Sequence, residues 1–185
     1  ERAQVMWQQT GMHNVSTGLA AVIAAYQVGV SVSQACDALS DFVGVKRRME
    51  VIYTNKGVTL YDDFAHHPTA IKTTLEGLRA KVGDGIIVAI IEPRSATMKM
   101  GIHQHALANS VDSADHVLWY QNSAVDWGME ELSSAIKIPS TAMSSLEQLI
   151  KTTTDLAHGG VHIVIMSNGG FEGFHGKLIN AIKKP

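Results

Sequence analysis

Residues 61–69 read Tyr-Asp-Asp-Phe-Ala-His-His-Pro-Thr, and this stretch decides the fold class of the chain. A short apolar strand, 58–60, precedes it, and an apolar pattern with a period of about 3.6 residues follows it from Ile71. Pro68 suits the first position of the resulting helix, where its missing N–H costs nothing. The stretch is therefore a strand-to-helix turn that carries two carboxylates, an aromatic ring and two imidazoles. In open α/β sheets such turns lie at the carboxyl ends of strands, where ligands bind.

Two further runs indicate a parallel sheet covered on both faces. Residues 86–91 (Ile-Ile-Val-Ala-Ile-Ile) and 161–166 (Val-His-Ile-Val-Ile-Met) are almost continuously apolar, as expected for doubly buried strands. Strands are also expected at 51–54, 58–61 and 117–120, and they alternate with helices expected at 68–82, 98–110, 144–157 and 172–183. This alternation predicts a doubly wound, Rossmann-like α/β fold with a mostly parallel sheet. A hairpin signal at Asn55-Lys56-Gly57 predicts that one edge strand is antiparallel.

The first part of the chain has a helical texture instead. Asn14 or Ser16 is expected to cap a first helix, and Ser31 or Ser33 a second. The change of texture predicts a boundary near residues 44–48, between a helical tail and the α/β domain.

Composition excludes several classes of function. With 185 residues, 45% hydrophobic and 17% charged, the chain is ordinary for a globular protein. A net charge of −2 gives no electrostatic footprint for nucleic acid or an anionic membrane, so neither is expected as a partner. The single cysteine, Cys36, excludes an internal disulfide and suits a reducing cytosol. No apolar run reaches the roughly 20 residues that span a bilayer, and no signal-peptide core follows the first residues. A cytoplasmic location is expected.

Five segments together carry a resemblance to a known family. They are Gly-Met-His-Asn at 11–14, Arg-Arg-Met-Glu at 47–50, Asp-Asp-Phe-Ala-His-His-Pro at 62–68, the segment 92–101 and Met-Ser-Asn-Gly-Gly-Phe at 166–171. In this order they resemble the Mur ligase family, the ATP-dependent amide-forming enzymes of peptidoglycan synthesis. The resemblance covers essentially the whole chain. It is greatest to the members that recycle peptidoglycan by joining UDP-N-acetylmuramate to the tripeptide L-alanyl-γ-D-glutamyl-meso-diaminopimelate.

The resemblance implies that this chain is part of a longer ligase. Residues 1–45 would be the end of the central ATP-binding domain, and residues 46–185 the carboxy-terminal domain. The chain has no Gly-Lys-Thr phosphate loop: Gly170 and Gly176-Lys177 are separated by five residues rather than four, and Leu178 follows them. ATP and Mg²⁺ would therefore be held mainly by the missing central domain, and the UDP-sugar by an amino-terminal one. The chain alone is expected to be inactive.

The resemblance also assigns residues to ATP. Asp63 would bind the ribose, as acidic residues at strand ends do in dinucleotide folds. Phe64 stands where the family often has Tyr, and would pack on the adenine through its ring face. His13 and Asn14 would lie beside the adenine. Thr17 stands where many members have a second Asn, which weakens that contact.

Within each of two adjacent pairs, Arg47 with Arg48 and His66 with His67, the two residues are expected to have different roles. Arg48 occupies the family position that approaches the ATP phosphates, where a hinge arginine supplies charge-assisted bonds on closure. Arg47 is expected to be a solvated neighbour. Neighbouring histidines on a turn rarely point at one ion, so no metal site is expected at His66 and His67. His66 is the one candidate for a catalytic role.

The peptide substrate is expected at two other strand ends. Arg94 follows the strand 86–91 and suits a substrate carboxylate. The segment Ser167-Asn168-Gly169-Gly170 follows the last strand, where exposed backbone N–H groups would form an anion nest. All five residues are therefore candidate substrate-binding residues.

Two other functions remain open. One is the sister reaction, a UDP-N-acetylmuramate–L-alanine ligase. That enzyme usually shows Gln-Pro-His-Arg where this chain has Glu-Pro-Arg-Ser at 92–95. The other is a non-catalytic, Rossmann-like nucleotide-binding module, which would bind a nucleotide without any other part of a ligase.

Overall fold

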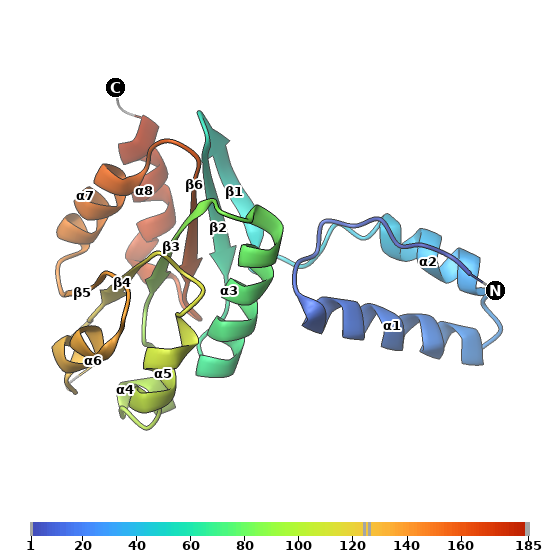
Figure 1. The fold of residues 1–185 in the computed structure, drawn as a ribbon, viewed down its shortest axis with the longest axis horizontal. Coiled ribbons are helices and arrows are strands. Elements are labelled where there is room, and N and C mark those ends of the chain that lie inside the picture. Colours follow the sequence, from blue (N-terminus) through green and yellow to red (C-terminus); the bar gives the residue numbers. More distant parts are fainter. Residues whose placement is uncertain (1, 124, 126, 184–185) are drawn as a thin grey trace.

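A computed structural model describes residues 2–123, 125 and 127–183 (Figure 1). Its centre is a sheet of six strands in the order β1-β2-β6-β3-β4-β5. The strands are β1 (Glu50–Asn55), β2 (Val58–Asp63), β3 (Ile86–Ile91), β4 (His116–Tyr120), β5 (Ser140–Met143) and β6 (Val161–Met166). Only the edge strand β1 runs antiparallel to its neighbour, and every other pair is parallel. The predicted mostly parallel sheet with one antiparallel edge is confirmed.

The antiparallel edge depends on a two-residue turn. Asn55 pairs with Val58, so Lys56 and Gly57 alone connect β1 to β2. Both have a positive φ, of 48° and 81°, as the favoured type I′ hairpin requires. The hairpin predicted at Asn55-Lys56-Gly57 is present.

Helices cover both faces of the sheet, which makes the fold doubly wound. On one face α3 (Pro68–Val82), α5 (Gln104–Ser110) and α6 (Met129–Ala135) bury residues such as Leu75, Leu107 and Leu132. On the other face α7 (Leu146–Leu156) and α8 (Phe174–Lys183) bury Leu149 and Leu178, among others. Figure 1 shows α7 and α8 to the left of the sheet and α3 to its right. Because both faces are buried, Ile87–Ile91 are entirely inaccessible to solvent.

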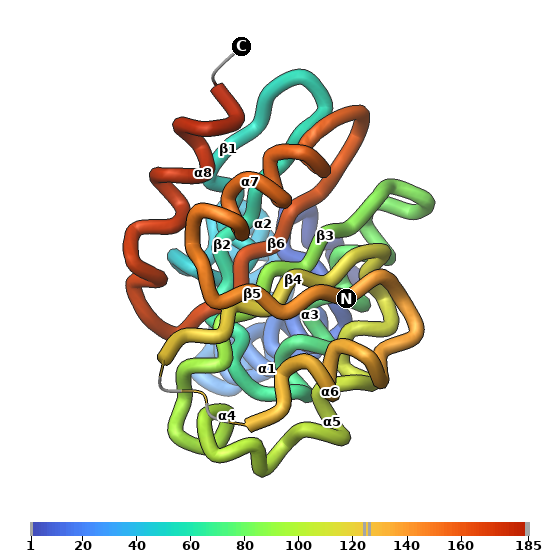
Figure 2. The backbone as a smooth tube through the Cα atoms, turned by 90° about the vertical axis from the view of Figure 1, so that its left-hand side faces the viewer, coloured from blue at the N-terminus to red at the C-terminus, as the bar shows by residue number. Residues whose placement is uncertain are grey.

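A pair of helices lies beside this α/β body, on the side of α3. They are α1 (Met12–Gln27) and α2 (Val32–Ser40), and in Figure 2 they lie behind the sheet. Gly11 lies against α3: its Cα would lie only 2.9 Å from a β-carbon on Gly77. Two glycines therefore allow the two backbones to meet directly. The capping box at Ser31 is present, but α1 begins after Gly11, so the expected caps at Asn14 and Ser16 are wrong.

The bounds of strands and helices match the expectations where the sequence pattern is strong. The strands 86–91 and 161–166 and the helix 68–82 have the expected bounds. The helix expected at 98–110 is wrong. It is broken into α4 (Ala96–Lys99) and α5 because Gly101 adopts a φ of 67°, in the left-handed region. The helix expected from residue 172 is preceded by a 3₁₀ turn, η1 (Phe171–Gly173). Helix α6 and strand β5 were not expected.

Candidate functional site

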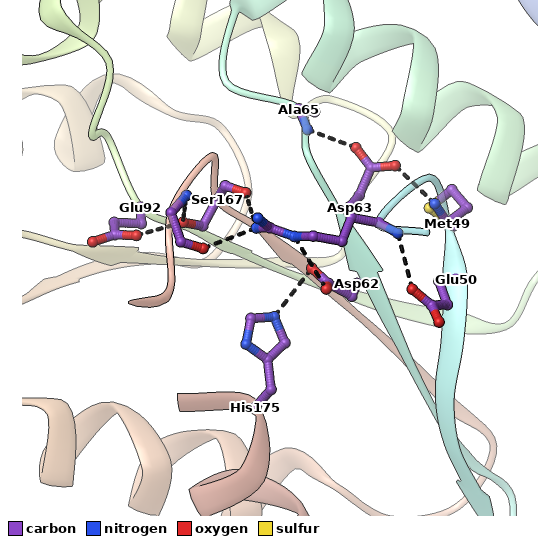
Figure 3. Close-up of polar contacts among 10 residues, drawn as sticks. Met49, Glu50, Asp62, Asp63, Ala65, Glu92, Ser167 and His175 are labelled. Carbon is purple, nitrogen blue, oxygen red and sulfur yellow. Dashed lines mark hydrogen bonds and ion pairs between the residues drawn. The ribbon is translucent and has the colours of Figure 1, made fainter. Parts of the chain in front are cut away.

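The carboxylate of Asp63 lies at the end of β2 and holds two turns together. Its Oδ1 accepts the N–H of Ala65 at 2.8 Å, and its Oδ2 accepts the N–H of Met49 at 2.9 Å (Figure 3). The residue is only 3% exposed. Burial raises the pKa of this carboxyl group, while the two N–H groups and the positive charge of Arg48 act in the opposite direction. Asp63 therefore ties residues 47–49, the junction before β1, to the strand-to-helix turn that follows β2.

Three cationic or aromatic side chains surround the ring of Phe64. The guanidinium carbons of Arg47 and Arg48 lie 5.1 and 5.6 Å from its centroid. The ring of His66 meets it edge-on at 5.3 Å. His66 Nδ1 pairs with the carbonyl oxygen of Phe64 at 2.9 Å, which leaves Nε2 as the second polar atom of the ring. Phe64 is half-buried, and Arg48 is exposed beside it.

The expectation that Arg47 is a solvated neighbour is wrong. Its Nη2 donates to the carbonyl oxygens of Ser167 at 2.5 Å and Gly169 at 2.9 Å. Its Nε lies 3.3 Å from Oδ2 of Asp62, and the exposed fraction of its side chain is 31%. The backbone turns this side chain inward because Arg47 adopts a left-handed φ of 59°.

Asp62 connects this arginine to the last helix. Its Oδ1 lies 3.1 Å from Nε2 of His175, on α8, and its side chain is 12% exposed (Figure 3). Asp62 thus has a partner on each side, Arg47 at the junction and His175 beyond the end of β6. Neither partner was expected from the sequence.

The loop 167–170 is held by hydrogen bonds of its own. Ser167 Oγ donates to Oε2 of Glu92 at 2.5 Å, and it accepts the N–H of Gly169 at 3.0 Å. The N–H of Ser167 donates to the carbonyl oxygen of Asp63 at 3.1 Å. Two of the four amides are therefore used within the protein, and the predicted anion nest is wrong for Ser167 and Gly169. The side-chain oxygen Oδ1 of Asn168 is buried and has no partner among the described residues.

Arg94 lies against this loop, as expected from the adjacency of two strand ends. It follows β3, and β3 pairs with β6 along its whole length. A β-carbon on Gly169 would lie 1.7 Å from Nη1 of Arg94, so the guanidinium fills the space that glycine leaves open. Arg94 is exposed, which leaves the donors of its fork available to a ligand at this edge.

His13 and Asn14 lie on the first turn of α1, away from this cluster. Asn14 Nδ2 donates to the carbonyl oxygen of Thr10 at 2.7 Å, and His13 is exposed. No hydrogen bond or ring contact joins either residue to Asp63 or Phe64 within the described part of the chain. The structure thus brings together Arg48, Asp63, Phe64 and His66, and separately Arg94 with the loop 167–170.

Several residues of this edge were missed as site residues. Glu92, buried to 4% exposure, supports Ser167, while Asp62 and His175 support Arg47. Asp62 and Glu92 share a signal, a polar residue at the carboxyl end of a buried strand or just beyond it, whereas His175 lies in α8 and carries no such signal. A polar residue at such a strand end has no core to fill and is retained for a partner.

Two further features, a cluster of metal-binding side chains and a membrane-spanning helix, are absent from the described residues. Within residues 2–123, 125 and 127–183, no group of three or more His, Cys, Asp or Glu side chains is placed to hold a metal ion. No helix in the same ranges is long and apolar enough to cross a membrane.

The fold and this edge define a class of protein: a doubly wound α/β domain with a polar edge where its parallel strands end, which is the edge at which such folds bind ligands. Residues 47–169 match the family model described as Mur ligase, glutamate ligase domain. The chain therefore belongs to the Mur ligase family, and it has the fold of that family's carboxy-terminal domain.

Two curated relatives share the chain almost end to end. Both are named UDP-N-acetylmuramate–L-alanyl-gamma-D-glutamyl-meso-2,6-diaminoheptandioate ligase. The protein of Escherichia coli is 44% identical and that of Haemophilus influenzae 41% identical, each over 98% of this chain. The chain spans 40% of the length of each relative.

A solved structure shows the same arrangement. The murein peptide ligase of Psychrobacter arcticus superposes with a TM-score of 0.74 at 49% identity, covering 98% of this chain and 39% of that protein.

Proposed function

We propose that this chain is the carboxy-terminal part of a cytoplasmic, ATP-dependent ligase of peptidoglycan recycling. The parent enzyme joins the carboxylate of UDP-N-acetylmuramate to the amino terminus of L-alanyl-γ-D-glutamyl-meso-diaminopimelate. Residues 1–45 belong to the end of its central ATP-binding domain, and residues 46–185 form its carboxy-terminal domain. Support comes from the two curated relatives that carry this name and match 98% of the chain.

One observation carries the proposal: the exposed guanidinium of Arg94 lies against Gly169 where β3 and β6 end. The tripeptide has several carboxylates, and a planar fork of five donors recognises such groups in a bidentate manner. Arg94 forms the peptide side of the site together with the loop Ser167, Asn168, Gly169 and Gly170. Because the N–H groups of Ser167 and Gly169 are bonded within the protein, those of Asn168 and Gly170 would face the peptide. A free alanine has a single carboxylate and needs fewer donors.

The ATP side of the site lies at the junction. Arg48 is the candidate for the phosphates, Phe64 and His13-Asn14 for the adenine, and Asp63 for the ribose. Each carboxylate oxygen of Asp63 accepts one N–H in this structure and keeps a further lone pair. Because Asp63 is almost fully buried, a ribose hydroxyl reaches it only if the Met49 turn shifts when the nucleotide binds.

The reaction proceeds through an acyl phosphate. The carboxylate of UDP-N-acetylmuramate attacks the γ-phosphorus of ATP, and ADP leaves. The peptide amine then attacks the acyl carbon, loses a proton and expels inorganic phosphate from a tetrahedral intermediate. His66 is our candidate to accept that proton. Its Nδ1 is hydrogen-bonded to the carbonyl oxygen of Phe64, which leaves Nε2 as the nitrogen that would take the proton. We assign Mg²⁺ mainly to the central domain of the parent enzyme, where it would offset the phosphate charge.

The test uses the full-length parent enzyme. ADP release is measured with ATP, UDP-N-acetylmuramate and either the tripeptide or L-alanine. We expect ADP release that depends on the tripeptide, together with an amide product of matching mass. Release that depends on alanine alone would assign the chain to the sister ligase. Nucleotide binding without turnover on either acceptor would favour the other alternative, a non-catalytic nucleotide-binding module.

A further inference from the structure

One side chain, that of Arg47, joins three separate parts of the described structure. Its guanidinium donates to the carbonyl oxygens of Ser167 and Gly169, at 2.5 and 2.9 Å, and lies 3.3 Å from the carboxylate of Asp62. The two carbonyls are 120 and 122 residues away in the sequence. Nη2 donates to both carbonyls while Nε faces the carboxylate, so two nitrogens held at a fixed spacing are used, which a single ammonium nitrogen cannot reproduce.

The backbone of Arg47 is anchored as firmly as its side chain. Its N–H donates to Oε2 of Glu50 at 2.9 Å, and its carbonyl oxygen accepts the N–H of Phe64 at 2.8 Å. Arg47 and Met49 both have a left-handed φ, of 59° and 51°, which non-glycine residues seldom adopt. Strain of this kind persists where the surroundings over-determine the conformation, and here Asp63, Glu50 and Asp62 do so.

The loop 167–170 depends on this arginine for its shape. Arg47 is the side chain that binds the two inward-facing carbonyls, and within the described residues no other donor reaches them. The same Gly169 whose carbonyl oxygen is bonded to Arg47 lies against the guanidinium of Arg94. Without Arg47 the carbonyls would lose a charge-assisted partner. The loop would keep the bonds made through Ser167 at its start and the bond from the N–H of Gly173 to the carbonyl oxygen of Gly170 at its end.

We propose that Arg47 is a positioning residue for the peptide substrate: it holds the loop 167–170 in the shape that Arg94 and the peptide require. Its neighbour Arg48 serves the nucleotide, so two adjacent residues of the junction address the two substrates. This inference rests on the proposed function for the identity of the peptide. The shape of the loop can be tested without it.

The experiment compares Arg47→Ala, Arg47→Lys and Arg48→Ala in the full-length parent enzyme. For Arg47→Ala we expect the KM for the tripeptide to rise by roughly tenfold or more, with the KM for ATP changed less than about threefold. Arg47→Lys should recover only part of the loss, because Lys restores the charge opposite Asp62 but not the fork. Arg48→Ala is the matched control, and it should raise the KM for ATP more than that for the tripeptide.

A second readout makes the result independent of activity. Amide hydrogen exchange by mass spectrometry follows the segment that contains Ser167 and Gly169, whose amides are hydrogen-bonded in this structure. Exchange should accelerate in Arg47→Ala and stay near the wild-type rate in Arg48→Ala. Unchanged exchange in Arg47→Ala, or an equal rise of both KM values, would overturn the role of Arg47. If the wild-type enzyme does not use the tripeptide, the proposed function fails while the exchange result still decides whether Arg47 holds the loop.

Discussion

The guanidinium of Arg94 lies where the β-carbon of any residue other than glycine at position 169 would have to be. An ideal Cβ on Gly169 would come within 1.7 Å of Nη1 and 2.4 Å of Cζ of Arg94. Gly169 has no left-handed φ that would require glycine, and the three atoms nearest to an added Cβ all belong to Arg94. Because of this contact with Arg94, a single methyl group at position 169 should disturb recognition of the peptide more than it disturbs folding.

Gly169→Ala should therefore displace Arg94 at little cost to stability. The clashing atoms are the far end of a flexible side chain, which can rotate away into solvent. In the full-length enzyme we expect the KM for the tripeptide to rise roughly tenfold and the KM for ATP to change little. Gly176→Ala, in α8, is the matched control because a β-carbon there meets nothing within 4 Å. A Gly169→Ala enzyme with wild-type peptide kinetics would argue against Arg94 as a peptide ligand.

Arg94→Ala should weaken tripeptide binding by about 2–3 kcal/mol and leave ATP binding nearly unchanged, since the lost pair is charged and partly desolvated. Arg94→Lys should restore little, because a point charge cannot reproduce two parallel bonds. Steady-state kinetics with each substrate varied in turn checks both variants. Equal changes in the two KM values would contradict the assignment, as would a structure with bound peptide in which Arg94 faces solvent.

Asp63→Asn should lower stability as well as nucleotide affinity. Each carboxylate oxygen accepts a backbone N–H, so an amide nitrogen in place of one oxygen would face a donor and leave it unpaired. A buried unpaired donor costs about 1–3 kcal/mol, which urea unfolding of the purified chain would measure. In the full-length enzyme the KM for ATP should rise more than that for the tripeptide. Wild-type stability in this variant would show that the Met49 turn does not need Asp63.

The phenol of Tyr120 should ionise at a higher pH than an ordinary tyrosine. Burial, together with its hydrogen bond to the carboxylate of Glu172 at 2.7 Å, raises the pKa of its phenol from 10.0 to about 12. Because the fold favours the neutral phenol, the stability that this group contributes is fully present below pH 10 and is lost as the pH rises toward 12. Alkaline titration of phenolate absorbance, wild type minus Tyr120→Phe, measures this pKa. Glu172→Gln should move this pKa down toward 10.0. An unmoved value would mean that burial and the charge of Glu92 account for the shift.

How much the sequence could predict depended on how strongly each segment is buried. The strands 86–91 and 161–166 are apolar along their length because both faces are covered, and their bounds were correct. Strand β5 reads Ser-Thr-Ala-Met and is only partly buried at the edge of the sheet, so it carries no such pattern. Helix α6 has seven residues, which is too short for a period of about 3.6 to stand out.

For the candidate site, the sequence predicts which residues lie at strand ends but not the direction of their side chains. Residues such as Asp63, Arg94 and Ser167 could be placed because they directly follow apolar runs. Nothing local distinguishes Arg47 from Arg48, since both are arginines in one turn. Their directions differ because Arg47 has a left-handed backbone and because its acceptors come from a loop 120 residues later. Such contacts depend on tertiary structure, and no single-sequence pattern encodes them.

The position of β6 has a consequence for the order in which the chain can fold. This strand lies between β2 and β3, and those two strands pair with it rather than with each other. On the ribosome, the β1–β2 hairpin and the strands β3 to β5 therefore emerge as two incomplete halves with open edges. The sheet closes only after residues 161–166 have been synthesised. Until then each half exposes an apolar edge strand to other chains, so nascent and carboxy-terminally truncated forms should be the ones that aggregate.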